Sequence, residues 1–208
     1  MTYRVIDLET WPRVAQFRLF RSYQQPHYAT TTRLDVTHLM SRKVDGLSIY
    51  RGCLYAIGAG LHAVPELCMR FRDDTVVAHD MITLSMTVPT DAGNFDYGYV
   101  PFVEDFDLFD RQAQSLIAEA AAGGLLDANS GERDDLAYLS CMPWLDYTSI
   151  NNALPGPDDC IPRVTWGKIV GRDGRWDMAM TLEVHHALVD GAQVGAYFAA
   201  AQEALNAI

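Results

Sequence analysis

The stretch that decides the fold is Leu182-Glu183-Val184-His185-His186-Ala187-Leu188-Val189-Asp190-Gly191. Apolar residues alternate along this strand, because four of them share one parity: Met178, Met180, Leu182 and Val184. That alternation predicts a strand with one face in the core. His186 continues the apolar face, whereas His185 lies on the opposite face. Asp190 and Gly191 follow at a sharp turn that leads into an Ala-rich helix.

The segments on either side predict a mixture of strands and helices. Asp173-Gly174 joins two expected strands, 163–170 and 176–186, in a hairpin. Helices are expected over 13–21, from Asp35 or Thr37, over 48–64, over 106–122 and over 191–208. Further strands are expected over 28–36, 68–71, 75–78, 83–88 and 136–149. With no internal repeat and no linker, we expect one α/β domain over 1–208, a two-layer sandwich of a mixed β-sheet and helices.

Composition excludes several functional classes. The 208 residues are 49% hydrophobic and 21% charged, which is ordinary for a globular protein with one core. A net charge of −11 repels phosphate backbones, so we expect no nucleic-acid partner. We expect no membrane span and no secretory signal. The four cysteines show no C-x-x-C spacing and indicate reduced thiols in a cytoplasmic protein.

Three interpretations of the His-His pair compete. A metal site is one, but no third cluster of His, Cys or Glu accompanies the pair, so we expect no metal. A structural pair is the second, and composition alone favours it. The third is catalytic, because partial desolvation of His186 at the end of an apolar face favours the neutral imidazole that a general base needs.

The run from His185 to Gly191 resembles the H-H-x-x-x-D-G signature of the chloramphenicol acetyltransferase family. Acyltransferase cores of 2-oxo acid dehydrogenase complexes and condensation domains of peptide synthetases share that signature. Condensation domains are about twice as long, and the dehydrogenase-complex enzymes usually carry lipoyl and linker segments. Five further pieces resemble the chloramphenicol acetyltransferases proper, in the family's order: Trp11 to Arg13 with Phe17 and Phe20, Tyr28 to Thr37, Pro65 to Arg70 with Asp73, Pro143 to Ser149, and Thr165 with Lys168.

The resemblance implies a CoA-dependent acyltransferase fold with acetyl-CoA as cosubstrate. It implies that His186 is the general base, which takes a proton from an acceptor hydroxyl for direct transfer in a ternary complex. Ser149 matches a serine that donates to the oxyanion, and Thr165 matches a threonine that orients the intermediate. Asp190 matches an aspartate that pairs with an arginine, here Arg13, and holds the turn beneath His186.

The resemblance also implies partners. Lys168 matches a lysine near the cofactor, a point charge suited to phosphates. Tyr28 and Phe95 fall near positions of the acceptor pocket, and the acceptor is a small-molecule alcohol, chloramphenicol in the named family. The family forms homotrimers with active sites at subunit interfaces, so that His186 comes from one subunit and much of the pocket from its neighbour.

One departure keeps the acceptor open. Asp146, three residues before Ser149, stands where the family often has Asn or Ser. A carboxylate there does not help an oxyanion donor unless it points away or is hydrogen-bonded. The same transfer to a different alcohol is therefore one alternative. A trimeric binding protein that has lost turnover is another, although a dead site has no need of the complete set of catalytic residues.

Overall fold

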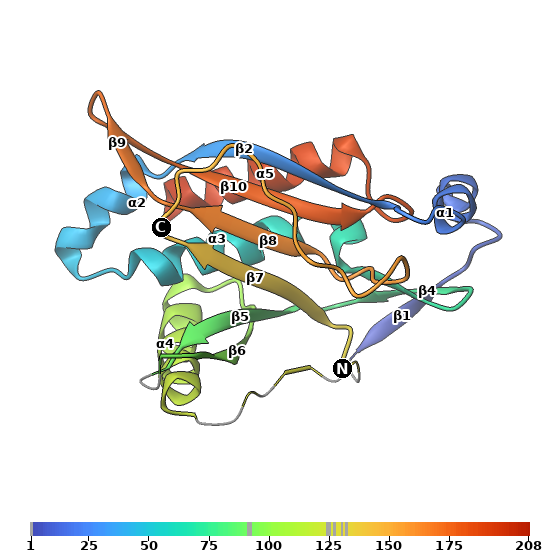
Figure 1. Cartoon of the computed structure of the whole chain (residues 1–208), viewed down its shortest axis with the longest axis horizontal. Coiled ribbons are helices and arrows are strands. Elements are labelled where there is room, and N and C mark those ends of the chain that lie inside the picture. The colour runs from blue at the N-terminus through green and yellow to red at the C-terminus, as the bar shows by residue number, and fades with distance from the viewer. Residues whose placement is uncertain (1, 91–92, 124–125, 127, 130, 132) are drawn as a thin grey trace.

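A computed structural model describes residues 2–90, 93–123, 126, 128–129, 131 and 133–208. Within these residues a mixed sheet carries helices on one face, which confirms the expected two-layer α/β architecture (Figure 1). Along the sheet the strand order is β2-β10-β8-β7-β5-β6, and β9 pairs with β10. The strands are β2 (His27–Asp35), β5 (Thr83–Pro89), β6 (Phe95–Pro101), β7 (Leu136–Met142), β8 (Arg163–Gly167), β9 (Val170–Arg172) and β10 (Arg175–His185).

The sheet is mixed because β7 runs parallel to both β5 and β8, while the other pairs are antiparallel. Parallel neighbours need crossover connections. Helix α4 (Phe106–Ala122) lies between β6 and β7 in the chain, and the irregular segment 143–162 connects β7 to β8. A separate small sheet has the order β1-β4-β3, formed by β1 (Tyr3–Ile6), β3 (Met69–Arg72) and β4 (Thr75–His79).

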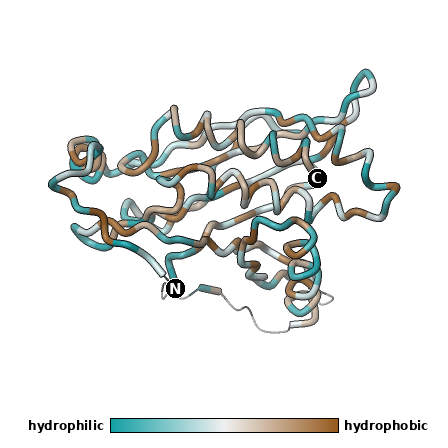
Figure 2. The backbone as a smooth tube through the Cα atoms, turned by 180° about the vertical axis from the view of Figure 1, so that it is seen from behind, coloured by the Kyte–Doolittle hydropathy of each residue, from teal (hydrophilic) through white to brown (hydrophobic). Residues whose placement is uncertain are grey.

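Helices α3 (Ile49–His62) and α5 (Gly191–Ala207) lie side by side against the sheet, as the view from behind shows (Figure 2). Glycines permit this close packing. A Cβ added at Gly60 would lie 2.9 Å from the Tyr197 ring, and one at Gly58 would lie 2.3 Å from the Phe102 ring. The remaining helical elements are α1 (Val14–Arg21), α2 (Thr37–Ser41), η1 (Arg42–Asp45) and η2 (Pro65–Cys68).

Two expected strand ends were wrong, and two strands were not expected. The strand expected over 136–149 ends at Met142, because Pro143 cannot donate to the ladder and begins a turn. The strand expected over 163–170 ends at Gly167, because the Lys168 N–H donates to the Leu145 carbonyl and leaves the sheet. Strands β1 and β6 were not predicted, although alternation in Phe95-Asp96-Tyr97-Gly98-Tyr99 was a usable signal for β6.

The two faces of the sheet are covered by different parts of the chain. Met178 contacts Cys53 of α3, and Met180 contacts Tyr197 of α5. The apolar face of β10 therefore lies in the core against the helices, as predicted. The opposite parity, with Thr181 and Glu183, forms what we call the outer face. No helix covers that face in the described residues; the segment 146–159 runs across it instead.

Candidate active site

His186 is the first residue after β10, one position beyond the strand end at His185. Its N–H donates to the Pro26 carbonyl at 2.9 Å, which holds the backbone against the segment before β2. Its ring stacks on Phe20 of α1, with centroids 3.8 Å apart and planes 10° apart. Neighbouring aromatic rings, rather than strand alternation, therefore set the orientation of this imidazole.

The hydrogen bonding of His186 specifies which nitrogen carries the proton. Nδ1 lies 3.1 Å from the Val189 carbonyl oxygen. Because a carbonyl only accepts, the bond requires a proton on Nδ1. In the neutral ring Nε2 then keeps its lone pair and is the atom that can accept a proton. The turn after β10 thus presents a histidine in the tautomer of a general base.

His185 is built differently and cannot play that part. It is 2% exposed, and both ring nitrogens are occupied: Nε2 lies 3.0 Å from the Pro157 carbonyl, and Nδ1 accepts from the Ala187 N–H at 3.1 Å. Burial and the nearby His27 lower the pKa of His185 to about 4. This neutral, buried ring fits the structural part expected for it.

The expected contact between Arg13 and Asp190 is present. Arg13 Nη1 donates to Asp190 Oδ2 at 2.6 Å, across 177 positions of sequence. The hydrogen bond from Arg13 lowers the pKa of Asp190. The pair is only partly buried, because the Asp190 side chain is 39% exposed and that of Arg13 is 13% exposed.

Asp190 has a second task that sequence reasoning missed. It caps α5: the Ala192 N–H donates to Asp190 Oδ1 at 3.0 Å, and the Asp190 N–H donates to Gln193 Oε1 at 3.1 Å. This is a capping box, and the spacing Asp190-x-x-Gln193 was the available signal. One carboxylate therefore both starts the helix and binds Arg13, which ties the turn below His186 to the segment before α1.

Tyr28 lies beside His186. Its ring centroid is 4.8 Å from that of His186, and its hydroxyl lies 3.4 Å from the Val189 carbonyl. Burial and the charge of Asp190 raise the pKa of Tyr28 to about 12. The tyrosine is therefore a neutral hydrogen-bonding group in the wall next to the imidazole.

Thr165 is not brought to His186 within one chain. It pairs in register with Thr181 on β10, five residues before His186. At about 3.3 Å per residue, roughly 16 Å of strand separate the two positions. The Thr165 hydroxyl lies 3.4 Å from Asn152 Oδ1, and the side chain is 1% exposed beneath the segment that crosses the outer face.

Ser149 lies on that crossing segment and is also remote from His186. Its neighbours Tyr147 and Asn152 bond to Thr181 and Glu183 respectively, so Ser149 sits over the middle of β10. The serine is exposed, and its hydroxyl makes no hydrogen bond to the described residues. Both expected oxyanion-site residues thus share the outer face, away from His186 of the same chain.

The carboxylate of Asp146 is engaged elsewhere. It accepts from Arg33 Nη2 at 2.9 Å and from Arg172 Nη2 at 2.6 Å. The hydrogen bond from Arg33 lowers the pKa of Asp146. The departure at this position therefore forms a surface ion-pair cluster with β2 and β9.

Lys168 and Phe95 lie at separate borders of the outer face. Lys168 is exposed where the chain leaves β8, and its side chain makes no ion pair within the described residues. Phe95 begins β6 with 49% exposure, and its ring packs edge-on against Tyr97 at 5.7 Å. Lys168 lies two residues after Trp166, which pairs with Met180, six residues before His186, so Lys168 is remote from that histidine. Strand β6, which Phe95 begins, lies away from α1 (Figure 1).

A cavity of about 940 Å³ opens on the outer face. Its floor lies on β5 and β7, and the crossing segment forms its roof. Asn152, the partner of Thr165, lines the cavity together with Ser140, which pairs with Thr165 in register. The cavity therefore adjoins the expected oxyanion-site residues, and sequence reasoning had not located it.

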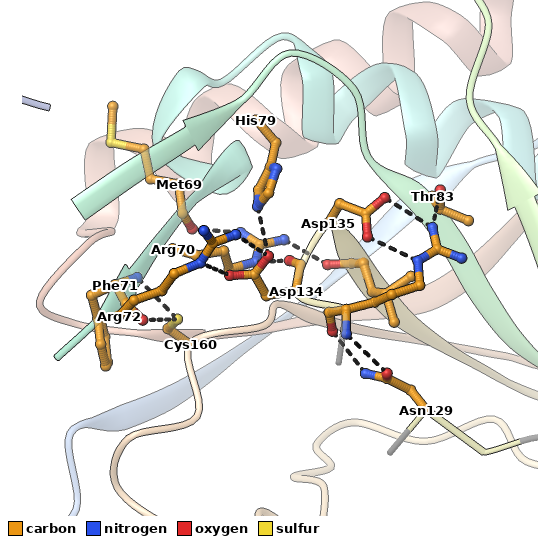
Figure 3. A network of polar contacts seen from close by, with 12 residues as sticks. Met69, Arg70, Phe71, Arg72, His79, Thr83, Asn129, Asp134, Asp135 and Cys160 are labelled. Atoms are coloured by element: carbon orange, nitrogen blue, oxygen red, sulfur yellow. Dashed lines mark hydrogen bonds and ion pairs between the residues drawn. The ribbon is translucent and has the colours of Figure 1, made fainter. Parts of the chain in front are cut away.

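Asp134 and Arg133, two charged side chains of the cavity lining, each form ion pairs. Asp134 accepts from Arg72 at 2.7 and 2.9 Å and contacts His79 Nε2 at 2.9 Å (Figure 3). Burial opposes its ionisation, yet the hydrogen bonds from His79 and Arg72 hold the pKa of Asp134 well below its usual range. Arg133 donates to Asp135 at 2.8 and 3.0 Å and to Thr83 (Figure 3).

The thiols are poor nucleophiles. Burial raises the pKa of Cys53 to about 12 and that of Cys68 and Cys141 to about 11. Burial also raises the pKa of the Cys160 thiol. In the described residues no group of three or more His, Cys, Asp or Glu side chains is arranged to hold a metal ion. Within the same ranges no helix combines the length and apolar character needed to cross a bilayer.

Comparison with known proteins decides the family. A family model described as chloramphenicol acetyltransferase matches residues 1–202. The chain belongs to the chloramphenicol acetyltransferase family. The predicted family is thereby confirmed, and because its members are acetyltransferases, the chain is an acyltransferase.

Relatives in this family match almost the whole chain. Chloramphenicol acetyltransferase 3 of Escherichia coli is 24% identical over 209 residues, which cover 99% of this chain and 98% of the relative. The enzyme of Clostridium perfringens is 26% identical over 207 residues, which cover 98% and 94%. A chloramphenicol acetyltransferase of known structure superposes with a TM-score of 0.91 at 27% identity, covering 98% of this chain and all of the other.

A more distant structure shares only the fold. A probable dihydrolipoamide acetyltransferase from Listeria monocytogenes superposes with a TM-score of 0.68 at 15% identity, covering 93% of this chain and 89% of the other. The expected CoA-dependent acyltransferase fold is therefore confirmed.

Proposed function

We propose that the protein is an acetyl-CoA-dependent O-acetyltransferase in which His186 is the general base. The observation that carries this proposal is the Nδ1 contact with the Val189 carbonyl, which leaves Nε2 free to accept a proton. Nε2 takes the proton of an acceptor hydroxyl, whose oxygen attacks the thioester carbonyl of acetyl-CoA and displaces the CoA thiolate. General-base catalysis of this kind contributes roughly 10²–10⁴ in rate.

Other residues support direct transfer. The exposed Ser149 hydroxyl is available to donate to the oxyanion of the tetrahedral intermediate, and Thr165 orients the intermediate through Asn152. Arg13 and Asp190 are positioning residues, because they hold the turn that carries the base. High thiol pKa values leave no competing cysteine nucleophile in the described residues. Lys168 supplies a charge for the CoA phosphates.

We propose a homotrimer whose active sites lie at subunit interfaces. Ser149 and Thr165 lie roughly 16 Å of strand from His186 in one chain, so a complete site needs the base of a neighbouring subunit. The outer face is suited to an interface: Trp144 and Leu145, just before Ser149, are 79% and 54% exposed. We place the enzyme in the cytoplasm, since its cysteines are free.

Chloramphenicol is the first candidate acceptor, because the relatives are named for it and Tyr28 and Phe95 provide aromatic surface. The same transfer to a different alcohol is a second candidate. Its support is the set of hydroxyl and amide groups in the cavity lining, among them Ser85, Ser140 and Asn152, which a pocket for a flat aromatic drug does not need.

The test measures release of CoA thiol with and without chloramphenicol. His186→Ala should lower kcat by roughly 10²–10⁴ without unfolding the protein, whereas His185→Ala should lower stability more than kcat. If His185→Ala is the inactive variant and His186→Ala keeps full activity, the assignment of the base is wrong.

Mixed oligomers test the shared site. His186→Ala and Ser149→Ala subunits, each defective alone, should regain activity when coassembled in equal amounts. In a cyclic trimer about a quarter of the interfaces then join an intact histidine to an intact serine. A mixture no more active than the average of the two variants would show that each chain forms its own site.

A further inference from the structure

The deep end of the cavity is lined by hydroxyl groups on the outer face. Ser85 and Thr87 project from β5, and Ser140 projects from the neighbouring β7. Tyr97 on β6 and Tyr138 on β7 stand on either side, because Thr87 pairs with Tyr97 and Ser85 pairs with Tyr138. We call these five residues the hydroxyl subsite.

Ser85 is the residue that points to a ligand. It is 2% exposed, and its Oγ has no hydrogen-bond partner among the described residues. A buried hydroxyl without a partner is disfavoured, so such a group is retained where something else satisfies it. The Thr87 and Ser140 hydroxyls likewise make no hydrogen bond to the described residues. The subsite therefore offers several donors and acceptors that the chain itself leaves unused.

The charges around the cavity are already neutralised, which argues for an uncharged ligand. Arg133 pairs with Asp135, Arg163 with Asp159, Asp134 with Arg72, and Asp158 with Arg21. An ionic ligand would have to break one of these pairs, at a cost in desolvation. A neutral ligand can bond to the free hydroxyls and lay its C–H surface on the Tyr97 and Tyr138 rings.

The position of the subsite sets the length that the ligand needs. Thr165, at the proposed reaction centre, lies on β8, and Ser85 lies two strands away on β5 and two residues further along. With about 4.8 Å between strands and 3.3 Å per residue, the two positions are roughly 12 Å apart. That is the length of an elongated small molecule with polar groups at both ends.

We propose that the hydroxyl subsite binds the far end of the acceptor, and that the acceptor is a neutral, multiply hydroxylated molecule such as a disaccharide glycoside or a polyol. This inference rests on the proposed acetyl transfer, and it specifies the acceptor class. Ser85 is the specificity-determining residue, and it acts through a hydrogen bond to a hydroxyl remote from the one that is acetylated.

The experiment uses three neutral probes (methyl β-maltoside, trehalose and maltitol), with chloramphenicol and the polycation kanamycin for comparison. CoA thiol release gives kcat and KM, and the shift in melting temperature without acetyl-CoA gives binding. At least one neutral probe should exceed both comparison compounds in kcat/KM. Ser85→Ala should raise KM for that probe roughly 3- to 10-fold, the value of one hydrogen bond, with kcat unchanged.

Controls separate the possible failures. Ser115→Ala, on the exposed face of α4, should change nothing, and Ser85→Thr should keep most of the affinity. If chloramphenicol alone releases thiol and no neutral probe binds, the subsite is refuted and the acetyl transfer stands. If a neutral probe binds through Ser85 but nothing releases thiol, the transfer fails and the subsite stands. Equal KM for wild type and Ser85→Ala also overturns the inference.

Discussion

Asp190→Asn isolates the charge of Asp190 from its helix cap. Asparagine caps helices as well as aspartate, so the bonds to Ala192 and Gln193 survive. The variant leaves the Arg13 guanidinium, which is 13% exposed and already has Nε and Nη2 without partners among the described residues, with no carboxylate. We expect the free energy of unfolding to fall by about 2 kcal/mol, a value typical of a hydrogen bond to a charged group.

The partner variant should cost less. Arg13→Met removes the charge together with its unpartnered nitrogens, and we expect a loss of about 1 kcal/mol. The double variant should lose about 1–2 kcal/mol less than the sum of the two, since contacting residues are not additive. Both single-variant losses are smaller than the roughly 3–5 kcal/mol lost when one partner of a fully buried pair is removed, because Asp190 is 39% exposed.

The assay is urea unfolding of the four proteins at one protomer concentration, with equal slopes required for comparison. Asp190→Ala, which also removes the cap, should cost about 1 kcal/mol more than Asp190→Asn. Strict additivity in the cycle, or Arg13→Met costing more than Asp190→Asn, would refute the reasoning. The anchoring of His186 by this pair would then need another explanation.

Two further predictions concern stability. His185 has a pKa of about 4 in the folded chain, against about 6.5 when unfolded. Between these values only the unfolded chain takes up the proton, so stability is full above pH 6.5 and falls by up to roughly 3 kcal/mol as pH drops to 4. His185→Gln should flatten that part of the curve in urea titrations at each pH; an unchanged pH slope would contradict it. Gly58→Ala should destabilise by roughly 1–3 kcal/mol, because its Cβ would lie 2.3 Å from Phe102; a melting temperature equal to that of the wild type would show that the ring moves freely.

Much of this protein follows from local sequence. Local patterns predicted the secondary structure of three segments: the alternation in β10, the Ala-rich run of α5 and the turn at Asp173-Gly174. They could do so because periodicity and turn chemistry depend on residues close together in the chain. The signature from His185 to Gly191 indicated the family. Strand parity did not decide the orientation of the His186 ring, because that residue lies beyond the end of β10. Where a single residue interrupts a pattern, as Pro143 does after β7, the local signal was misread as a continuing strand.

Tertiary structure alone decided the rest, because it depends on groups far apart in the chain. The stacking of Phe20 on His186 and the distance between Arg13 and Asp190 arise from the docking of α1 beside the end of β10. The cavity exists because the segment 146–159 folds over the outer face. That segment has no periodic pattern from which its path could be predicted. Ser85 reads as an ordinary strand serine, and only its burial without a partner, between strands β6 and β7, distinguishes it.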